Sequence, residues 1–348
     1  MPILSKIMTE IFFLLPLIFL TYLYFVRNNE GKGFFILMIL FLFIAVSFRE
    51  PTCKYNDVHN YLRNYKYGLK MVLNYELFFA YLQVVLINFK IGFQWLLIIT
   101  NAISLLVLSF AICRSDKKIV HVLALYYILT YYFIGYNVMR QMLGVSFVLL
   151  GYTYLNEEKV KKFVVCVLIA FFFHHSCIFT LVCLLFYKKD VFFNHVHVCF
   201  WLIVTFLLGA IKITPLVLNK LSWIIPYYVR DDLSKYAEGN NFSLSKIMLN
   251  LMFMYMYTRI DNRNLYLKIV FVGILLFNLF AYSDSIRIAY GFTTAQIFLY
   301  ADTKDEINSF KTLDKVIIYG YALFLFYYMF CNNIVGVQNY EFCDGKYF

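Results

Sequence analysis

The sequence predicts an all-α fold, a polytopic bundle of about twelve transmembrane helices. Hydrophobic residues make up 62% of the 348 residues, whereas soluble domains have roughly 45–50%. Charged residues reach only 15%, against roughly 25% in soluble proteins, so too few polar residues exist to cover a water-facing surface. Aromatic residues reach 21%, which suits helix ends lying in the aromatic belts of a bilayer. We therefore expect residues 1–348 to form a single integral membrane domain.

The apolar runs give the candidate spans, since a helix needs about 20 residues to cross a bilayer. Runs near this length, some of them shorter, lie at 8–26, 33–48, 92–112, 119–135, 138–155, 191–211, 246–258, 265–281, 286–301 and 313–331. Two further stretches are ambiguous. The stretch 71–90 is apolar but contains Glu76 and Lys90, and the stretch 163–187 is interrupted by His174-His175-Ser176.

Basic loops between the runs predict the orientation, because cytoplasmic loops carry an excess of Lys and Arg. The basic groups are Arg27 with Lys32, Arg114 with Lys117 and Lys118, Lys159 with Lys161 and Lys162, Lys188 with Lys189, Arg259 with Arg263, and Lys304 with Lys311. All of them face the cytoplasm if 71–90 is an interfacial helix on the outer side and 163–187 is a hairpin that turns at the two histidines. This arrangement predicts outer loops at 49–90 and 212–245.

The formal charge of +11 does not indicate a nucleic acid partner, because the basic residues are explained by orientation in the membrane. The eight cysteines form no CxxC pair and mostly lie in apolar runs, so we expect neither a disulfide framework nor a zinc site. HExxH, Walker A, GxGxxG and DxD-like signatures are missing from the sequence. We therefore expect no cofactor and no tightly bound metal.

Basic residues also occur in the first outer loop, against the general bias. They are Arg49, Lys54, Arg63, Lys66 and Lys70. A positive outer surface suits an anionic ligand, although contact with lipid phosphates explains it as well.

Under this topology the unusual polar residues lie near the outer ends of several spans. They are Arg49, Asp57 and Tyr61, then Asn137, Arg140 and Gln141, then His174 and His175, then Arg230 in the second outer loop, and finally Arg287 with Tyr290. A charge at the centre of a membrane helix costs roughly 2.5–3.5 kcal/mol. Several such residues from separate spans therefore predict a shared site.

These residue types suit displacement of a lipid diphosphate by a sugar hydroxyl. Arginines bind phosphate oxygens and stabilise charge on a leaving diphosphate. A histidine accepts the proton of an attacking hydroxyl, and Asp57 orients that histidine, acts as base itself or pairs with an arginine. Structural roles remain open for each: Arg49 and Arg287 as interface anchors, Tyr61 in packing, and the histidines as caps of the hairpin.

Four segments resemble, in order, the EpsG-like polysaccharide polymerases, which are related in role to the Wzy O-antigen polymerases. The segments are Ser47-Phe48-Arg49 followed by Asp57 and Tyr61, then Asn137 to Leu143, Leu168 to Ser176, and Arg287 with Tyr290. The third segment favours His174 as the histidine of the family. One departure is Val58, which follows Asp57 where an aromatic residue is expected.

The resemblance implies a glycosyltransferase of the helical GT-C type in the bacterial inner (cytoplasmic) membrane. It would polymerise oligosaccharide repeat units linked to undecaprenyl diphosphate at the outer face, as in capsule, exopolysaccharide or O-antigen synthesis. Its partners would be the lipid-linked donor and acceptor, the lipid bilayer and a chain-length regulator. His174 and Asp57 would be catalytic. The substrate would be bound by Arg49, Tyr61, Arg140, Gln141, His175, Arg230, Arg287 and Tyr290.

Other functions fit the same class of protein. A flippase for lipid-linked sugars is the main alternative. Transporters often carry charges near the bilayer midplane and consist of two related halves. Here the charges cluster at the outer ends of the spans, and the sequence shows no obvious repeat between its halves. An O-antigen ligase shares nearly all of the chemistry. A membrane O-acyltransferase acting on glycans would use His and Arg as well.

Overall fold

A computed structural model describes residues 2–26, 31–51, 57–73, 75–189, 194–211, 244–280, 286–303, 310–331 and 347–348. Within these ranges every named element is a helix, and the only β-type pairing is an isolated antiparallel bridge between Lys117 and Thr303. The predicted all-helical fold is confirmed. Arg230 and nearly all of the second outer loop lie outside the described residues.

The chain divides into two compact units. Unit 1 comprises residues 1–178 and 300–348, and unit 2 comprises residues 179–299. Each unit is a bundle of helices with apolar side chains inside it. The expectation of one membrane domain with outer loops at 49–90 and 212–245 stays a prediction.

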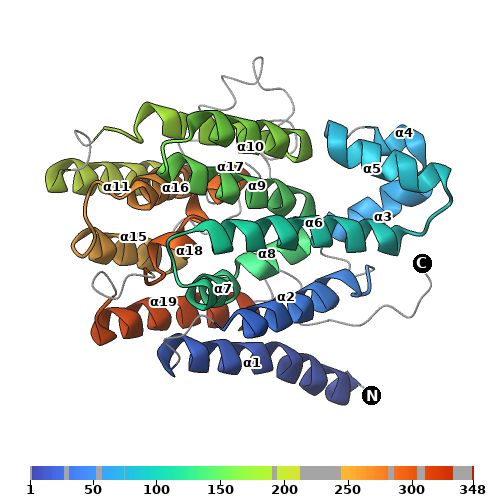
Figure 1. Cartoon of the computed structure of the whole chain (residues 1–348), viewed down its shortest axis with the longest axis horizontal. Helices are drawn as coiled ribbons and strands as arrows, with labels where there is room; N and C mark the ends of the chain where they lie inside the picture. The colour runs from blue at the N-terminus through green and yellow to red at the C-terminus, as the bar shows by residue number, and fades with distance from the viewer. Residues whose placement is uncertain are drawn as a thin grey trace. The chain divides into compact units, whose positions relative to one another are not determined.

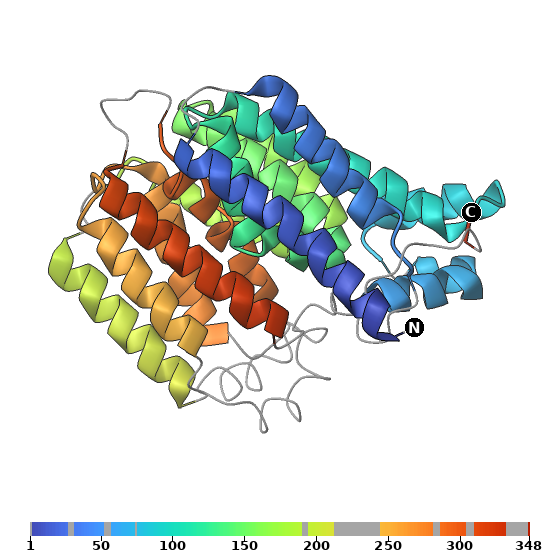
Figure 2. The same cartoon turned by 90° about the horizontal axis from the view of Figure 1, so that it is seen from below.

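Unit 1 is built on α9, whose side chains are buried along most of the helix. Its helices are α1 (Pro2–Val26), α2 (Lys32–Ser47), α3 (Asp57–Tyr67), α4 (Leu69–Val72), α5 (Leu77–Asn88), α6 (Phe93–Arg114), α7 (Ile119–Ile128), α8 (Tyr131–Asn137), α9 (Met139–Asn156), α10 (Val160–Phe173) and α19 (Thr312–Cys331). Helix α9 packs against α10 and α6, and α3, α4 and α5 gather near the beginning of α6 (Figures 1 and 2).

Two glycines allow α9 to lie close to α10. A Cβ at Gly144 would be 2.8 Å from Sγ of Cys177 and 3.1 Å from the carbonyl oxygen of Ala170. A Cβ at Gly151 would be 3.0 Å from the ring of Phe163. Small residues permit this close approach of helices in membranes, where van der Waals packing drives association.

A buried carboxylate joins α19 to α7 in unit 1. Asp302 is fully buried, and its Oδ2 lies 2.6 Å from Nζ of Lys315 and 3.5 Å from Nδ1 of His121. Its backbone oxygen accepts a hydrogen bond from the N–H of Lys118 (2.8 Å). Asp302 therefore connects Lys118, which immediately precedes α7, to Lys315 of α19.

Unit 2 contains α11 (His195–Ala210), α15 (Leu244–Tyr257), α16 (Leu265–Phe280), α17 (Ile286–Thr293) and α18 (Gln296–Leu299). A 3₁₀-helix, His175–Leu185, begins in unit 1 and ends in unit 2. Asn250 and Asn278 exchange side-chain hydrogen bonds of 2.9 and 3.0 Å, and Asn278 also donates to Thr205 (3.3 Å). Such amide contacts hold helices together where lipid offers no hydrophobic driving force.

Several described helices have the composition of membrane spans. Helix α6 and Thr312–Phe330 of α19 are long and apolar enough to cross a bilayer, and α7 with α8 forms a third candidate that is bent by 53°. Shorter apolar helices are Phe13–Phe25, Lys32–Ser47, Leu77–Asn88, His175–Leu185, His195–Ala210 and Leu265–Phe280. These apolar helices support the classification as a membrane protein.

Both ambiguous stretches are interrupted. The stretch 71–90 becomes α4 and α5, and α5 has 12 residues, which at 1.5 Å per residue is too short to cross a bilayer. Helix α10 ends at Phe173, and His174 is extended (φ −157°, ψ 120°), so the α-helix stops at the histidine pair. The side of the membrane on which each break lies stays a prediction.

Candidate functional site

Three breaks between helices bring polar side chains together in unit 1. Glu76 immediately precedes α5, and Arg140 lies in the first turn of α9. His174 separates α10 from the 3₁₀-helix, whose first residue is His175. The beginning of α9 is itself set by a break, because Val138 (φ −100°, ψ 52°) separates it from α8. We call Glu76, Arg140, His174, His175 and their contacts the Arg140 site.

A buried ion pair forms the centre of the Arg140 site. Nη1 of Arg140 donates to Oε2 of Glu76, and the two residues are 9% and 7% exposed. The guanidinium carbon lies 5.8, 4.9 and 5.9 Å from the ring centroids of Tyr61, Tyr75 and Phe79. Aromatic faces attract a cation at such distances, and more strongly when water is excluded. The guanidinium is thus held between three rings and one carboxylate.

The other oxygen of Glu76 faces His175. The backbone N–H of His175 donates to Oε1 at 3.4 Å, and Nδ1 of the ring lies 3.9 Å from the same oxygen. The side chain of His175 is 59% exposed, although its ring contacts Phe171 with a centroid distance of 5.0 Å. Glu76 therefore connects a buried arginine to an accessible imidazole.

His174 has different surroundings. It is 4% exposed, and its Nδ1 lies 2.7 Å from Oγ of Ser176, whose backbone N–H also donates to Nδ1 (3.3 Å). Gln141 in turn donates from Nε2 to Oγ of Ser176 (3.3 Å). The hydrogen bonds run from Gln141 through Ser176 to His174, so they attach the histidine break to the first turn of α9.

Arg49 and Asp57 lie near the end of α8, on the other side of the Val138 break. The guanidinium of Arg49, a residue that is 3% exposed, lies 4.1 Å from the ring centroid of Tyr136. Oδ1 of Asn137 accepts a hydrogen bond from the backbone N–H of Asp57 (2.7 Å). That contact satisfies a donor at the beginning of α3, as a helix cap does.

The structure thus brings together five of the residues that the sequence singles out: Tyr61, Arg140, Gln141, His174 and His175. Arg49 and Asp57 contact the neighbouring end of α8. Arg287 and Tyr290 lie in α17 of unit 2, and Arg230 lies outside the described residues. Their convergence with the Arg140 site stays a prediction.

The sequence analysis missed Glu76, Tyr75 and Phe79 as parts of the site. Glu76 counted only as a polar interruption of the stretch 71–90. A carboxylate within an apolar run could have indicated Glu76 as a site residue, because ionisable residues in such runs usually have a partner and a function. Nothing in the sequence pairs Glu76 with Arg140 across 64 positions.

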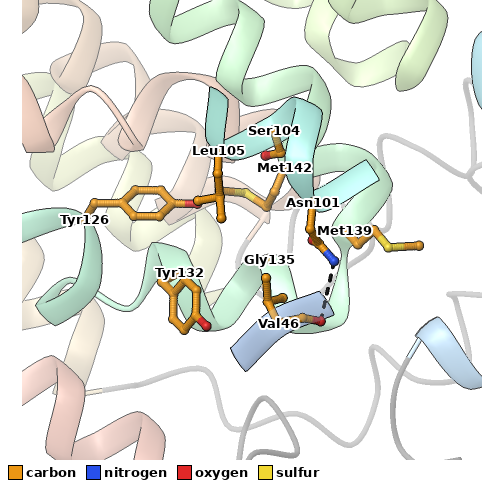
Figure 3. A pocket seen from close by; sticks show the side chains of 9 residues that line it. All are labelled: Val46, Asn101, Ser104, Leu105, Tyr126, Tyr132, Gly135, Met139 and Met142. Atoms are coloured by element: carbon orange, nitrogen blue, oxygen red, sulfur yellow. Dashed lines mark hydrogen bonds between the residues drawn. The ribbon is translucent and has the colours of Figure 1, made fainter. Parts of the chain in front are cut away.

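A small cavity lies beside the Val138 break and is too small for a substrate. Residues of α2, α6, α7, α8 and α9 line it, including Asn101, Ser104 and Met139 (Figure 3). Its volume is about 20 Å³, which is room for one water molecule.

Metal binding finds no support among the residues that the structure describes, where no group of three or more His, Cys, Asp and Glu side chains is placed to hold an ion. The Arg140 site contains one carboxylate, that of Glu76, and two imidazoles. The ring of His175 faces Glu76, whereas the ring of His174 faces Ser176. That no metal or cofactor is required stays a prediction.

Comparison with curated proteins and with solved structures finds no match. A family model does match: that of the EpsG family, over residues 32–342. The match spans all four segments on which the resemblance was based, and it includes every residue of the Arg140 site. The chain belongs to the EpsG family, which confirms the family resemblance inferred from its sequence.

Proposed function

We propose that the protein is a membrane polymerase of polysaccharide repeat units. It transfers a growing glycan from undecaprenyl diphosphate to the terminal sugar of an incoming lipid-linked repeat unit, at the outer face of the bacterial cytoplasmic membrane. Membership of the EpsG family supports a polymerase-like membrane protein. About twelve spans, a GT-C type of helical architecture and a chain-length regulator as partner belong to the same proposal.

The observation that carries the proposal is the buried guanidinium of Arg140 beside an exposed histidine. In the reaction, the oxygen of an acceptor hydroxyl attacks the anomeric carbon while the bond from that carbon to the diphosphate oxygen breaks. The electron pair of the broken bond stays on the diphosphate, where arginine N–H groups stabilise it. An arginine carries five N–H donors in a fixed fork, a geometry that suits carboxylate and phosphate oxygens.

Other residues complete the proposed site. Arg49, Arg230 and Arg287 contact the diphosphate, and Tyr61, Gln141 and Tyr290 contact the glycan or its lipid carrier. The proton of the hydroxyl passes to the histidine pair or to Asp57. Because His174 and His175 adjoin the beginning of α9, a base at this break lies on the same side of unit 1 as the guanidinium of Arg140.

Deletion of the gene, followed by analysis of the surface glycan, tests the function. Loss of a polymerase leaves single repeat units on lipid at the outer face, whereas loss of a flippase leaves them inside the cell. We expect wild-type protein to restore long glycan and Arg140→Ala to restore only single units. Lys161→Ala, at an exposed position in α10, is the matched control and should restore full length. Full-length glycan from Arg140→Ala would contradict the proposal.

A further inference from the structure

We propose that His175, rather than His174, accepts the proton of the attacking hydroxyl, and that Glu76 is the positioning residue that orients it. The inference rests on the proposed polymerase function and assigns two roles within it. Neither role follows from the sequence resemblance, which favours His174 and does not include Glu76. Three structural differences between the two histidines carry the inference.

Access is the first difference. A base must come within hydrogen-bond reach of the hydroxyl that it deprotonates, which is about 2.6–3.2 Å between heavy atoms. The side chain of His175 is 59% exposed, whereas His174 is 4% exposed. A sugar hydroxyl therefore reaches the ring of His175 without rearrangement of the helices.

The tautomer is the second difference. Nδ1 of His174 accepts the backbone N–H of Ser176, and Oγ of Ser176 lies 2.7 Å from the same nitrogen. Because Nδ1 accepts that N–H, the hydroxyl of Ser176 is the donor in its contact with Nδ1, while its Oγ accepts from Gln141. Nδ1 is then an acceptor, so the proton of the neutral ring is on Nε2. That tautomer of His174 donates at Nε2 and does not accept there.

For His175 the same reasoning gives the opposite tautomer. Its Nδ1 faces a carboxylate oxygen of Glu76 at 3.9 Å, so the ring proton is favoured on Nδ1 and Nε2 is the acceptor. Contacts of this kind are often long in the empty site and shorten when substrate is bound. A carboxylate behind a base also stabilises the imidazolium that forms when the proton arrives.

The third difference is the connection to Arg140. Glu76 binds the guanidinium through Oε2 and faces His175 through Oε1, so one carboxylate sets the position of both groups. In the step, the hydroxyl proton moves to Nε2 of His175, the new bond forms at the anomeric carbon, and the diphosphate leaves with the electron pair. Arg140 is near the developing negative charge while Glu76 is near the developing positive charge.

The test uses purified full-length protein in nanodiscs, with lipid-linked repeat units taken from membranes of the deletion strain. We expect His175→Ala to lower kcat by about 10²–10⁴-fold, the usual contribution of a general base. Added imidazole should raise the kcat of His175→Ala by at least about tenfold, because the vacated position is exposed. Any activity lost in His174→Gln should not return with imidazole, because that side chain is buried. His197→Ala, at an exposed histidine of α11 outside the Arg140 site, is the control and should match wild type.

Glu76 is tested by a double-mutant cycle, because a purely structural role would lower activity in any background. Glu76→Gln should lower kcat by about tenfold, and its effect should be clearly smaller when His175 is already alanine, because only the contact of Glu76 with Arg140 is then affected. An equal effect of Glu76→Gln in both backgrounds would overturn its positioning role.

The possible failures are distinguishable. If wild-type protein does not elongate the repeat units, the proposed function is wrong and this assignment is wrong with it. If wild type elongates them while His175→Ala is as active as wild type, or is inactive without rescue by imidazole, the proposed function stands and the assignment of His175 is overturned.

Discussion

Arg140 and Glu76 are 64 positions apart in the sequence, yet they form an ion pair that is buried between α9 and the beginning of α5. A buried pair of this kind stabilises little by itself, but removal of one partner leaves an uncompensated charge and costs roughly 3–5 kcal/mol. The pair therefore makes the position of α5 depend on α9.

The first prediction concerns this pair. Glu76→Ala and Arg140→Ala should each lower the thermal unfolding temperature in detergent, because each leaves one charge buried alone. The double variant Glu76→Ala with Arg140→Ala should lose less stability than the sum of the two single variants, because neither charge is then left alone. Thermal unfolding of the three purified variants checks this, and strictly additive losses would mean that the two side chains do not interact.

The second prediction concerns the contact of α9 with α10. Gly144→Ala should destabilise the protein by about 1–3 kcal/mol, because its Cβ would press on Cys177 and on the Ala170 carbonyl. Gly320→Ala in α19 is the control. No atom lies within 4 Å of the added Cβ, so stability should rise by about 0.5–1 kcal/mol through helix propensity. Equal stabilities of the two variants would contradict the close approach of α9 and α10.

The third prediction concerns Asp302, whose carboxylate joins α19 to α7. Asp302→Asn leaves Lys315 beside a neutral group and should cost about 3–5 kcal/mol. Glu157→Gln is the matched control, because the side chains of Glu157 and Lys159 are 36% and 49% exposed and their pairing at 2.6 Å lies near solvent. A change below about 1 kcal/mol is expected there. Chemical unfolding of both variants provides the comparison.

The fourth prediction concerns orientation in the membrane. A cysteine at Tyr67, which is 70% exposed, should react with an impermeant maleimide in intact spheroplasts. A cysteine at Lys161 should react only after permeabilisation, since the positive-inside rule places the segment 156–162 in the cytoplasm. All eight native cysteines are first replaced by alanine, because Cys113 is exposed and Cys53 lies in the predicted outer loop. Labelling of both positions from the same side would refute the predicted topology.

The sequence alone predicted the all-helical class and singled out Tyr61, Arg140, Gln141, His174 and His175, which the structure brings together. Composition determined the helical membrane class, and the polar interruption at His174-His175-Ser176 correctly located a break in a helix. Arg140 and Gln141 stood out because charge is costly in an apolar span. These signals are local, so a single sequence displays them.

Pairing was what the sequence could not supply. Glu76 and Arg140 meet only because α5 and α9 pack in one unit, and the rings of Tyr75 and Phe79 look like ordinary apolar residues in the chain. The opposite environments of His174 and His175 arise from an extended residue at the break. The pairing of Glu76 with Arg140 and the environments of the two histidines depend on how distant segments pack. The residue types along the chain therefore do not predict them.

The glycines of α9 have a consequence for how the protein tolerates change. Because Gly144 and Gly151 fix α10 against α9 by direct contact, the register of the two helices, rather than the loop that joins them, sets the distance from the histidines to Arg140. Substitutions in residues 157–159 should therefore leave the distance from the histidines to Arg140 unchanged.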